Sequence, residues 1–222
     1  MIIAIDGPSG SGKSTLGRML ARALKLLYVD TGSMYRAVGL AVIEAQLDPQ
    51  DTEAVTALAN EIDIDLEGDP DSLKVLLNGR DVTERIRSDD VTAMSSIISS
   101  ISGVRRAMVA RQRALGRRGA VLNGRDIGTV VFPNADIKFF LTALQEERAE
   151  RRFKEDQNTS PASNSLAQTL AEMIARDKRD STRADSPLRV ADGAIVVDSS
   201  GKTIDEVFAM MMDQISNVHR NN

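Results

Sequence analysis

The chain has 222 residues, of which 42% are hydrophobic and 27% are charged, as is usual for globular proteins. Its formal net charge of -4 argues against a surface for nucleic acid, and the lack of cysteine excludes disulfides, thiolate metal sites and a cysteine nucleophile. No apolar run approaches membrane-spanning length, and a strand predicted to start at residue 2 leaves no room for a signal peptide, so we expect a cytoplasmic protein without a membrane partner.

The first stretch of the chain combines a strand, a glycine-rich turn and a helix. An apolar run over residues 2–5 predicts a buried strand, and apolar residues spaced three and four apart over 16–27 predict a helix. Between them the pattern G-x-x-x-x-G-K-[ST] is matched by Gly7, Pro8, Ser9, Gly10, Ser11, Gly12, Lys13 and Ser14, followed by Thr15. This context favours a phosphate-binding P-loop over the alternative, a Gly/Ser-rich turn between two core elements.

The residue types of this motif suit a nucleoside triphosphate. Glycines allow successive backbone N–H groups to converge on an anion, and the helix that follows adds the positive end of its dipole. Lys13 is predicted to reach the β- and γ-phosphates, and the hydroxyl of Ser14 is predicted to bind Mg²⁺. We therefore expect a triphosphate site that uses Mg²⁺ as its cofactor.

Four further apolar runs predict the other strands of a sheet. They cover residues 26–30, 120–123, 137–141 and 194–198, and helical stretches separate all five runs. This alternation predicts an α/β fold with a five-stranded parallel sheet wrapped by helices on both faces. A capping box from Thr203 to Glu206 marks the start of the final helix.

Residues 31–119 are far more than a simple crossover unit needs, which is about 30 in total. The predicted elements are helices over 34–45, 53–60, 91–101 and 104–115, and strands over 62–66, 73–77 and 81–83. Asn78-Gly79 marks a tight hairpin, and Ser102-Gly103 marks a break between the last two helices. We interpret residues 31–105 as a small antiparallel insert lobe on the substrate side, within one domain spanning 1–222.

Residues 148–165 are predicted to form a lid. The segment 145–160 is charged and then polar, which is typical of a helical arm that ends in a mobile loop. The alternative is a solvated helix with i, i+4 ion pairs such as Glu147 with Arg151, and the charge pattern alone leaves both interpretations open.

Arginine-containing segments are expected to meet at the mouth of the P-loop. Residues 30–36 and 124–129 leave the carboxyl ends of two strands, outside which the ligand crevice of an open parallel sheet lies. Arg176, Asp180 and Arg183 fall on one helix face, for which a salt-bridged surface stripe is the alternative interpretation. Because guanidinium groups bind phosphate through two parallel hydrogen bonds, the convergence predicts a second, phosphorylated substrate.

Together these motifs resemble those of the bacterial cytidylate kinase family. The resemblance rests on residues 7–15, 30–36, 78–82, 104–113, 124–133 and 176–188, and it spans nearly the whole chain. It implies a P-loop nucleoside-monophosphate-kinase fold that transfers phosphate from ATP to CMP or dCMP.

The resemblance also implies roles for individual residues. Arg36, Arg125 and Arg183 would hold the acceptor phosphate, with Lys13, Arg125 and Arg183 as the catalytic set. Ser96, Arg105 and Asp126 would face the cytosine edge, Arg176 and Asp180 the sugar, and Thr31 and Tyr35 would complete the CMP site. Arg148 and Arg152 would belong to the lid over ATP. Two positions depart from the family pattern: Asn123 replaces an expected acidic residue, and Ser33 replaces the usual alanine.

The expected chemistry needs no general base. A phosphate monoester is mostly dianionic at pH 7, because its second pKa is about 6. Catalysis would then rest on positioning and on charge neutralisation. The alternatives are a kinase for UMP, AMP or shikimate, and a non-catalytic P-loop nucleotide switch. We expect ATP and CMP or dCMP as the partners of a protein that is a monomer.

Overall fold

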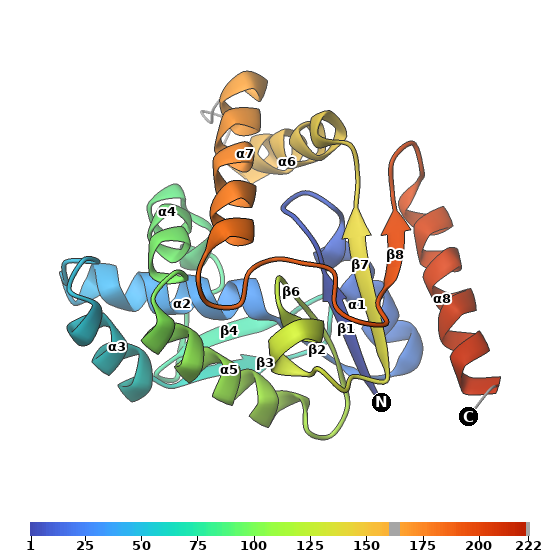
Figure 1. Cartoon of the computed structure of the whole chain (residues 1–222). Helices are drawn as coiled ribbons and strands as arrows, with labels where there is room; N and C mark the ends of the chain where they lie inside the picture. Colours follow the sequence, from blue (N-terminus) through green and yellow to red (C-terminus); the bar gives the residue numbers. More distant parts are fainter. Residues whose placement is uncertain (160–164, 221–222) are drawn as a thin grey trace.

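The computed structural model describes residues 1–159 and 165–220. Its centre is a sheet in the strand order β2-β6-β1-β7-β8, and every neighbouring pair is parallel (Figure 1). The strands are β1 (Ile2–Asp6), β2 (Leu27–Asp30), β6 (Ala120–Gly124), β7 (Ile137–Thr142) and β8 (Ile195–Asp198). The predicted five-stranded parallel sheet is therefore confirmed, and each strand boundary lies within one residue of its predicted position.

The insert departs from the sheet after β2. The chain between β2 and β6 contains α2 (Thr31–Glu44), α3 (Thr52–Glu61), β3 (Ile64–Glu67), β4 (Lys74–Leu77), β5 (Arg80–Asp81), the 3-10 turn η1 (Arg85–Arg87), α4 (Asp89–Ile98) and α5 (Ser102–Gly116), and α5 begins within the insert and continues beyond residue 105. The three short strands pair antiparallel, and Asn78 and Gly79 form the hairpin turn with φ angles of 50° and 77°. Positive φ at both positions is what a two-residue hairpin turn requires, so the predicted small antiparallel sheet is confirmed.

Three helices of this stretch have boundaries that differ from prediction by two or three residues, and one of them, α4, covers Asp89–Ile98 instead of 91–101. α2 begins at Thr31, directly after β2, because the carboxylate of Asp30 accepts hydrogen bonds from the backbone N–H and the hydroxyl of Ser33 (3.4 and 2.8 Å) and caps the helix. Ser102-Gly103, predicted as a break, is the first turn of α5. A Cβ on Gly103 would lie 2.2 Å from the hydroxyl of Thr56, so this glycine allows α3 and α5 to pack closely.

Alternate side chains of the sheet enter two apolar cores. Ile3 and Ile5 of β1 pack on one face with α1 (Lys13–Leu24) and α8 (Ile204–Arg220). Ala4, between them, belongs to the other core, which the insert shares. Because side chains alternate between the two faces of a strand, a continuous apolar run buries both faces of the sheet.

The predicted lid segment lies beyond the carboxyl ends of the strands. α6 (Gln145–Thr159) and α7 (Leu166–Thr182) lie at this end of the molecule, at the top of Figure 1, where α6 follows the chain that leaves β7 and α7 stands near α4. The expected i, i+4 pair is present, with 3.1 Å between Arg151 and Glu147. Residues 160–164 of the predicted lid lie outside the described residues.

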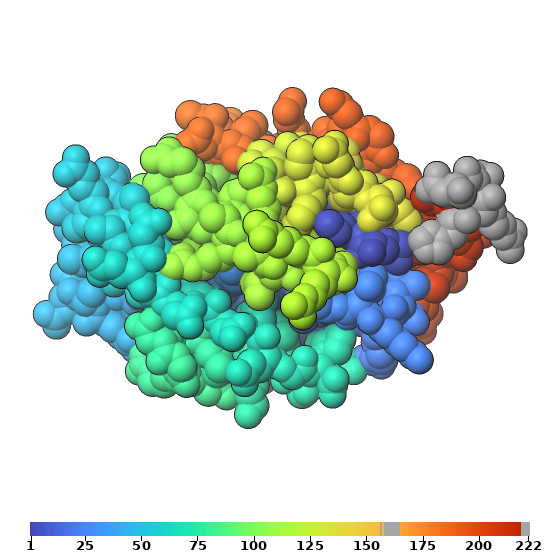
Figure 2. All heavy atoms as spheres, turned by 90° about the horizontal axis from the view of Figure 1, so that it is seen from below, coloured from blue at the N-terminus to red at the C-terminus, as the bar shows by residue number. Residues whose placement is uncertain are grey.

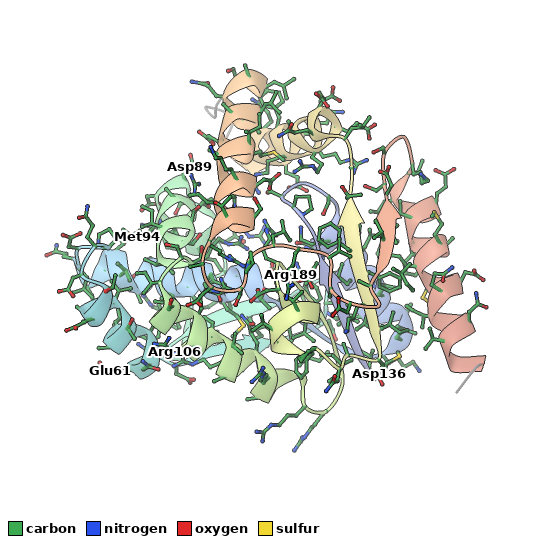
Figure 3. All side chains as sticks on the ribbon, viewed as in Figure 1. Glu61, Asp89, Met94, Arg106, Asp136 and Arg189 are labelled. Carbon is green, nitrogen blue, oxygen red and sulfur yellow. The ribbon has the colours of Figure 1, made fainter. Side chains whose placement is uncertain are left out.

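The opposite end of the sheet is closed by side chains and by the insert. Asp136, labelled in Figure 3, precedes β7 there and accepts a hydrogen bond of 2.6 Å from the backbone N–H of Ile2. Seen from below, residues of the insert and of α5 form much of this surface (Figure 2). The crevice with its polar side chains lies at the other end, at the carboxyl ends of the strands.

Candidate active site

A crevice lies between the carboxyl edge of the sheet and α4, α6 and α7, whose arrangement Figure 1 shows. It is lined by the P-loop, the start of α2, the end of β6, α6 and α7. The lining residues are Ser9, Gly10, Gly12, Lys13, Ser14, Thr15, Asp30, Thr31, Gly32, Tyr35, Arg36, Ser95, Ser99, Arg105, Asn123, Gly124, Arg125, Asp126, Arg152, Glu155, Arg176, Asp180 and Arg183.

The P-loop joins β1 to α1 through a backbone that glycine alone adopts without strain. Gly10 and Gly12 have φ angles of 71° and 91°, in the left-handed region. A Cβ on Gly7 would lie 2.1 Å from the carbonyl oxygen of Leu141. Gly12 caps α1, and within the described structure no side chain caps the first turn, so its backbone N–H groups are available to an anion.

Lys13 is held inside this loop with 6% of its surface exposed. Its Nζ donates to the carbonyl oxygen of Pro8 and to the hydroxyl of Ser11, the latter at 3.2 Å. Burial, followed by the charges of Arg125 and Arg176, holds the pKa of Lys13 well below its usual range. An anion bound at the loop would offset each of these effects, and it would favour the ammonium form.

Several arginines face the same space. Burial, and then the neighbouring charge of Arg125, lowers the pKa of Arg176 to about 10. Burial also lowers the pKa of Arg36, although the nearby carboxylate of Asp30 acts in the opposite direction. Desolvated cations that lie close together favour a ligand with several negative charges, and this crevice is therefore suited to phosphate groups.

Carboxylates pair with part of this arginine cluster. Arg105 donates to Asp126 at 2.5 Å, and both side chains are buried. Arg125 donates to Asp180 at 2.8 Å, and Arg183 lies 3.4 Å from Asp180 and 3.8 Å from Asp126. Asp180 and Arg183 thus belong to a network of ion pairs at the crevice, and Arg176 lines the same crevice, so the three predicted residues are not an exposed surface stripe.

The end of β6 offers groups that suit a Mg²⁺–nucleotide complex. Asn123 donates from Nδ2 to the hydroxyl of Ser14 at 3.1 Å. Its Oδ1 is buried and has no hydrogen-bond partner among residues 1–159 and 165–220. Mg²⁺ usually keeps several waters and binds proteins through one or two groups, so the Ser14 hydroxyl would hold this ion and the unpaired amide oxygen of Asn123 would suit its surroundings.

Most predicted site residues line the crevice, but five of the described ones do not: Gly7, Pro8, Ser11, Ser96 and Arg148. In the described structure, Ser96 is absent from the lining, and its hydroxyl accepts a hydrogen bond of 3.0 Å from Arg179. Ser95 and Ser99, on the neighbouring face of α4 and at its end, line the crevice instead. Arg148 is also absent from the described lining, because it is buried against Ser9 and Asp177.

Sequence reasoning missed four residues that shape the site. Asn123, which departs from the family pattern and is not among the predicted site residues, lies beside Ser14. The carboxylate of Asp6 accepts hydrogen bonds from the backbone N–H groups of Ile127 and Gly128 (2.8 and 2.7 Å), and it fixes the turn after Asp126. Asp30 caps α2, and Asp177 binds the P-loop. The sequence signal was a polar residue directly after an apolar strand for Asp6, Asp30 and Asn123.

Comparisons with known proteins agree with this geometry. A family model described as "Cytidylate kinase" matches residues 3–217. A cytidylate kinase of Desulforamulus reducens is 50% identical over 207 residues, and one of Halalkalibacterium halodurans is 45% identical over 208 residues; the matches cover 92% and 93% of both chains, respectively. An uncharacterised protein from Eubacterium ventriosum shares the fold, with a TM-score of 0.56, 13% identity and 98% coverage of both chains.

A search for membrane-spanning helices in the described parts of the chain found none with the necessary length and apolar character.

Proposed function

The chain belongs to the cytidylate kinase family, and we propose that the crevice is the active site in which ATP phosphorylates CMP or dCMP. The observation that carries this proposal is the meeting of arginines from separate segments beside one P-loop. Arg36 comes from α2, Arg125 from the end of β6, and Arg176 and Arg183 from α7 and its end. A nucleotide switch needs the P-loop alone, whereas two phosphorylated substrates need this second set of cations.

ATP would bind with its phosphates on the backbone N–H groups that follow Ser9. Lys13 would lie beside the β- and γ-phosphates, and the hydroxyl of Ser14 would hold Mg²⁺, with Asn123 beside it. When bound, Mg²⁺ neutralises charge on the phosphate oxygens. Arg152, which lines the crevice from α6, is placed to contact ATP from the lid side.

The acceptor would enter from the side of the insert. Its phosphate is mostly dianionic at pH 7 and attacks without a general base. Arg36, Arg125 and Arg183 would hold that phosphate in line with the γ-phosphate of ATP. Because charge spreads over the transferred group in a loose transition state, these fixed cations lower the barrier electrostatically.

The pyrimidine would lie beside the buried pair of Arg105 and Asp126. Cytosine offers an N4 donor and two acceptors, N3 and O2, which match a carboxylate and a guanidinium. Tyr35, whose ring lies 5.6 Å from the guanidinium carbon of Arg105, closes this side, and Thr31 lines the phosphate side. Ser96 would reach the base after its contact with Arg179 is released, while Arg176 and Asp180 would face the sugar.

We also propose that the insert, residues 31–105, and the lid, residues 148–165, close over the two substrates, and that the enzyme is a monomer. Closure would exclude water, which otherwise competes as the acceptor. Hydrogen exchange with CMP and a non-hydrolysable ATP analogue should show new protection in both segments. Protection confined to residues 7–15 would contradict closure. The cytoplasmic location stays a prediction.

A coupled ADP-release assay with a panel of acceptors tests the proposed function. We expect CMP and dCMP to be phosphorylated with much higher kcat/KM than UMP, AMP or shikimate. A preference for another acceptor would replace the proposed substrate, and no acceptor-dependent ADP release would favour the nucleotide switch.

A further inference from the structure

Arg148 and Asp177 hold the backbone of one P-loop residue between them. The carbonyl oxygen of Ser9 accepts a hydrogen bond of 2.9 Å from Nη1 of Arg148. The backbone N–H of Ser9 donates to Oδ1 of Asp177 at 3.3 Å. Nη1 of Arg148 also donates to Oδ2 of Asp177 at 2.6 Å, so the two side chains and the residue they hold form a closed ring.

This ring is buried and rigidly supported. The side chain of Arg148 is 7% exposed and that of Asp177 is 18% exposed. Nε of Arg148 donates to the carbonyl oxygen of Ala143 at 3.2 Å, which fixes the guanidinium plane. A charge-assisted pair in such a low-dielectric place is stronger than a surface pair, and removing one partner leaves the other charge buried.

The main chain of α6 lies against the same loop. A Cβ on Gly10 would lie 2.5 Å from the carbonyl oxygen of Arg148. Residues 9 and 10 therefore contact both the side chain and the backbone of Arg148. The amide groups that follow, from Gly10 to Thr15, remain for the phosphates.

The ring also joins the P-loop to both lid helices. Arg148 is in the first turns of α6, which carries Arg152 one turn later. Asp177 is in α7, directly after Arg176 and three residues before Asp180, which both line the crevice. The negative charge of Asp177 also acts on Lys13, where it favours the ammonium form.

We propose that Arg148 and Asp177 are positioning residues, which hold the Ser9 peptide so that the P-loop has its phosphate-binding shape before ATP arrives. This proposal rests on the proposed function for the identity of the nucleotide. It gives Arg148 a different role from the predicted contact with ATP, because Arg148 would act through the backbone of Ser9. A preformed loop loses less conformational entropy when ATP binds, so ATP binds more tightly. The added binding free energy is the same in the ground state and in the transition state.

Two conservative substitutions test the proposal. Arg148→Lys keeps the charge but loses the forked geometry, and Asp177→Asn keeps the shape but loses one acceptor and the charge. Ordering one extra residue on binding corresponds to about a tenfold loss of affinity, so we expect KM for ATP to rise about tenfold in each variant with kcat nearly unchanged. The Kd for CMP alone should stay within about twofold of the wild-type value, because neither substitution changes the residues that are proposed to bind CMP.

Arg151→Lys is the matched control on the same helix. Arg151 binds Glu147 at 3.1 Å and the hydroxyl and carbonyl oxygens of Ser199, each at 2.9 Å, on the side of β8. In the ligand-free protein, amides 9–13 should exchange faster in Arg148→Lys and Asp177→Asn, while Arg151→Lys should match the wild type. If all three variants accelerate exchange evenly along α6 and α7, the ring stabilises the helices only, and the proposal is wrong.

Binding of tripolyphosphate separates positioning from a contact with the nucleotide base. A loop that has lost its shape should bind tripolyphosphate and ATP more weakly by the same factor. If Arg148→Lys weakens ATP binding alone, Arg148 contacts the adenosine part, and the proposal is overturned for that residue. Should one variant fail to fold, the other carries the same tests. Exchange and tripolyphosphate binding require no CMP phosphorylation, so they remain decisive even if the proposed function fails.

Discussion

Gly10→Ala is the substitution whose effect can be worked most directly from the structure. The new Cβ would lie 2.5 Å from the carbonyl oxygen of Arg148, and 3.1 Å from both its carbonyl carbon and its Cβ. Non-bonded heavy atoms attract best at about 3.5 Å, so the P-loop and α6 must separate by about 1 Å. The φ angle of 71° adds about 1–2 kcal/mol of backbone strain for a residue with a side chain.

Gly79→Ala separates these two effects. Gly79 has a similar φ of 77°, but among the described residues beyond 78–80 no heavy atom lies within 4 Å of the place that a Cβ would take, so alanine there carries backbone strain without a clash. We expect Gly79→Ala to reduce the free energy of unfolding by about 1–2 kcal/mol and to retain full activity. Gly10→Ala should be less stable than Gly79→Ala, and its kcat/KM should fall about 10²-fold, because a displacement of about 1 Å misaligns the phosphates.

Urea unfolding and the ADP-release assay with CMP provide both measurements. The free energy of unfolding of Gly10→Ala is compared with that of Gly79→Ala, so that the backbone strain common to both variants cancels. If Gly10→Ala keeps kcat/KM within about threefold of the wild type, the loop tolerates the displacement, and the reasoning about its shape is refuted.

Three further predictions concern charged residues of the site. Lys13→Ala should lower kcat by at least about 10²-fold with unchanged circular dichroism, and activity within a few-fold of wild type would contradict the P-loop assignment. Asp126→Asn should reduce the preference for CMP over UMP in kcat/KM, because an amide donor can meet O4 of uracil; equal losses for both would show that Asp126 only orients Arg105. Burial raises the pKa of Asp6 from 3.8 to about 6, so the folded ligand-free protein binds this proton more tightly than the unfolded chain does. Stability from this group should therefore fall by about 3 kcal/mol as pH rises from about 4 to 6, and urea unfolding should show a smaller loss in Asp6→Asn than in the wild type.

The sheet could be predicted because its strands are short, continuous apolar runs between helical patterns. Strand order could not be predicted, since the pairing of β1 with β6 and β7 depends on contacts across more than a hundred residues. The predicted start of α2 was wrong for a local reason. Asp30 ends β2 and also caps α2, so the sequence 30–36 looked like a loop between them.

Some site residues could also be predicted from the sequence, whereas others depend on contacts between distant segments. Lys13 and Ser14 follow from a motif whose parts are adjacent in sequence. Ser96 was placed at the crevice by resemblance, but one position along a helix turns a side chain by about 100°, and in this structure its neighbour Ser95 faces that space. The role of Arg148 depends on Asp177, and the charge pattern of α6 contains no information about a partner on another helix.

The position of β1 in the centre of the sheet has a consequence for synthesis. Ile2 pairs with Ala120, and Ile3 pairs with both Val121 and Ile137. At about 5–20 residues per second, a ribosome needs roughly 10 s after making β1 to make its first partner strand. During that interval the hairpin at Asn78-Gly79 can pair with its own neighbours, whereas the apolar run of β1 has no strand to join. β2 also pairs with β6, so both of these apolar runs stay without a partner strand until residue 120 and those after it are made.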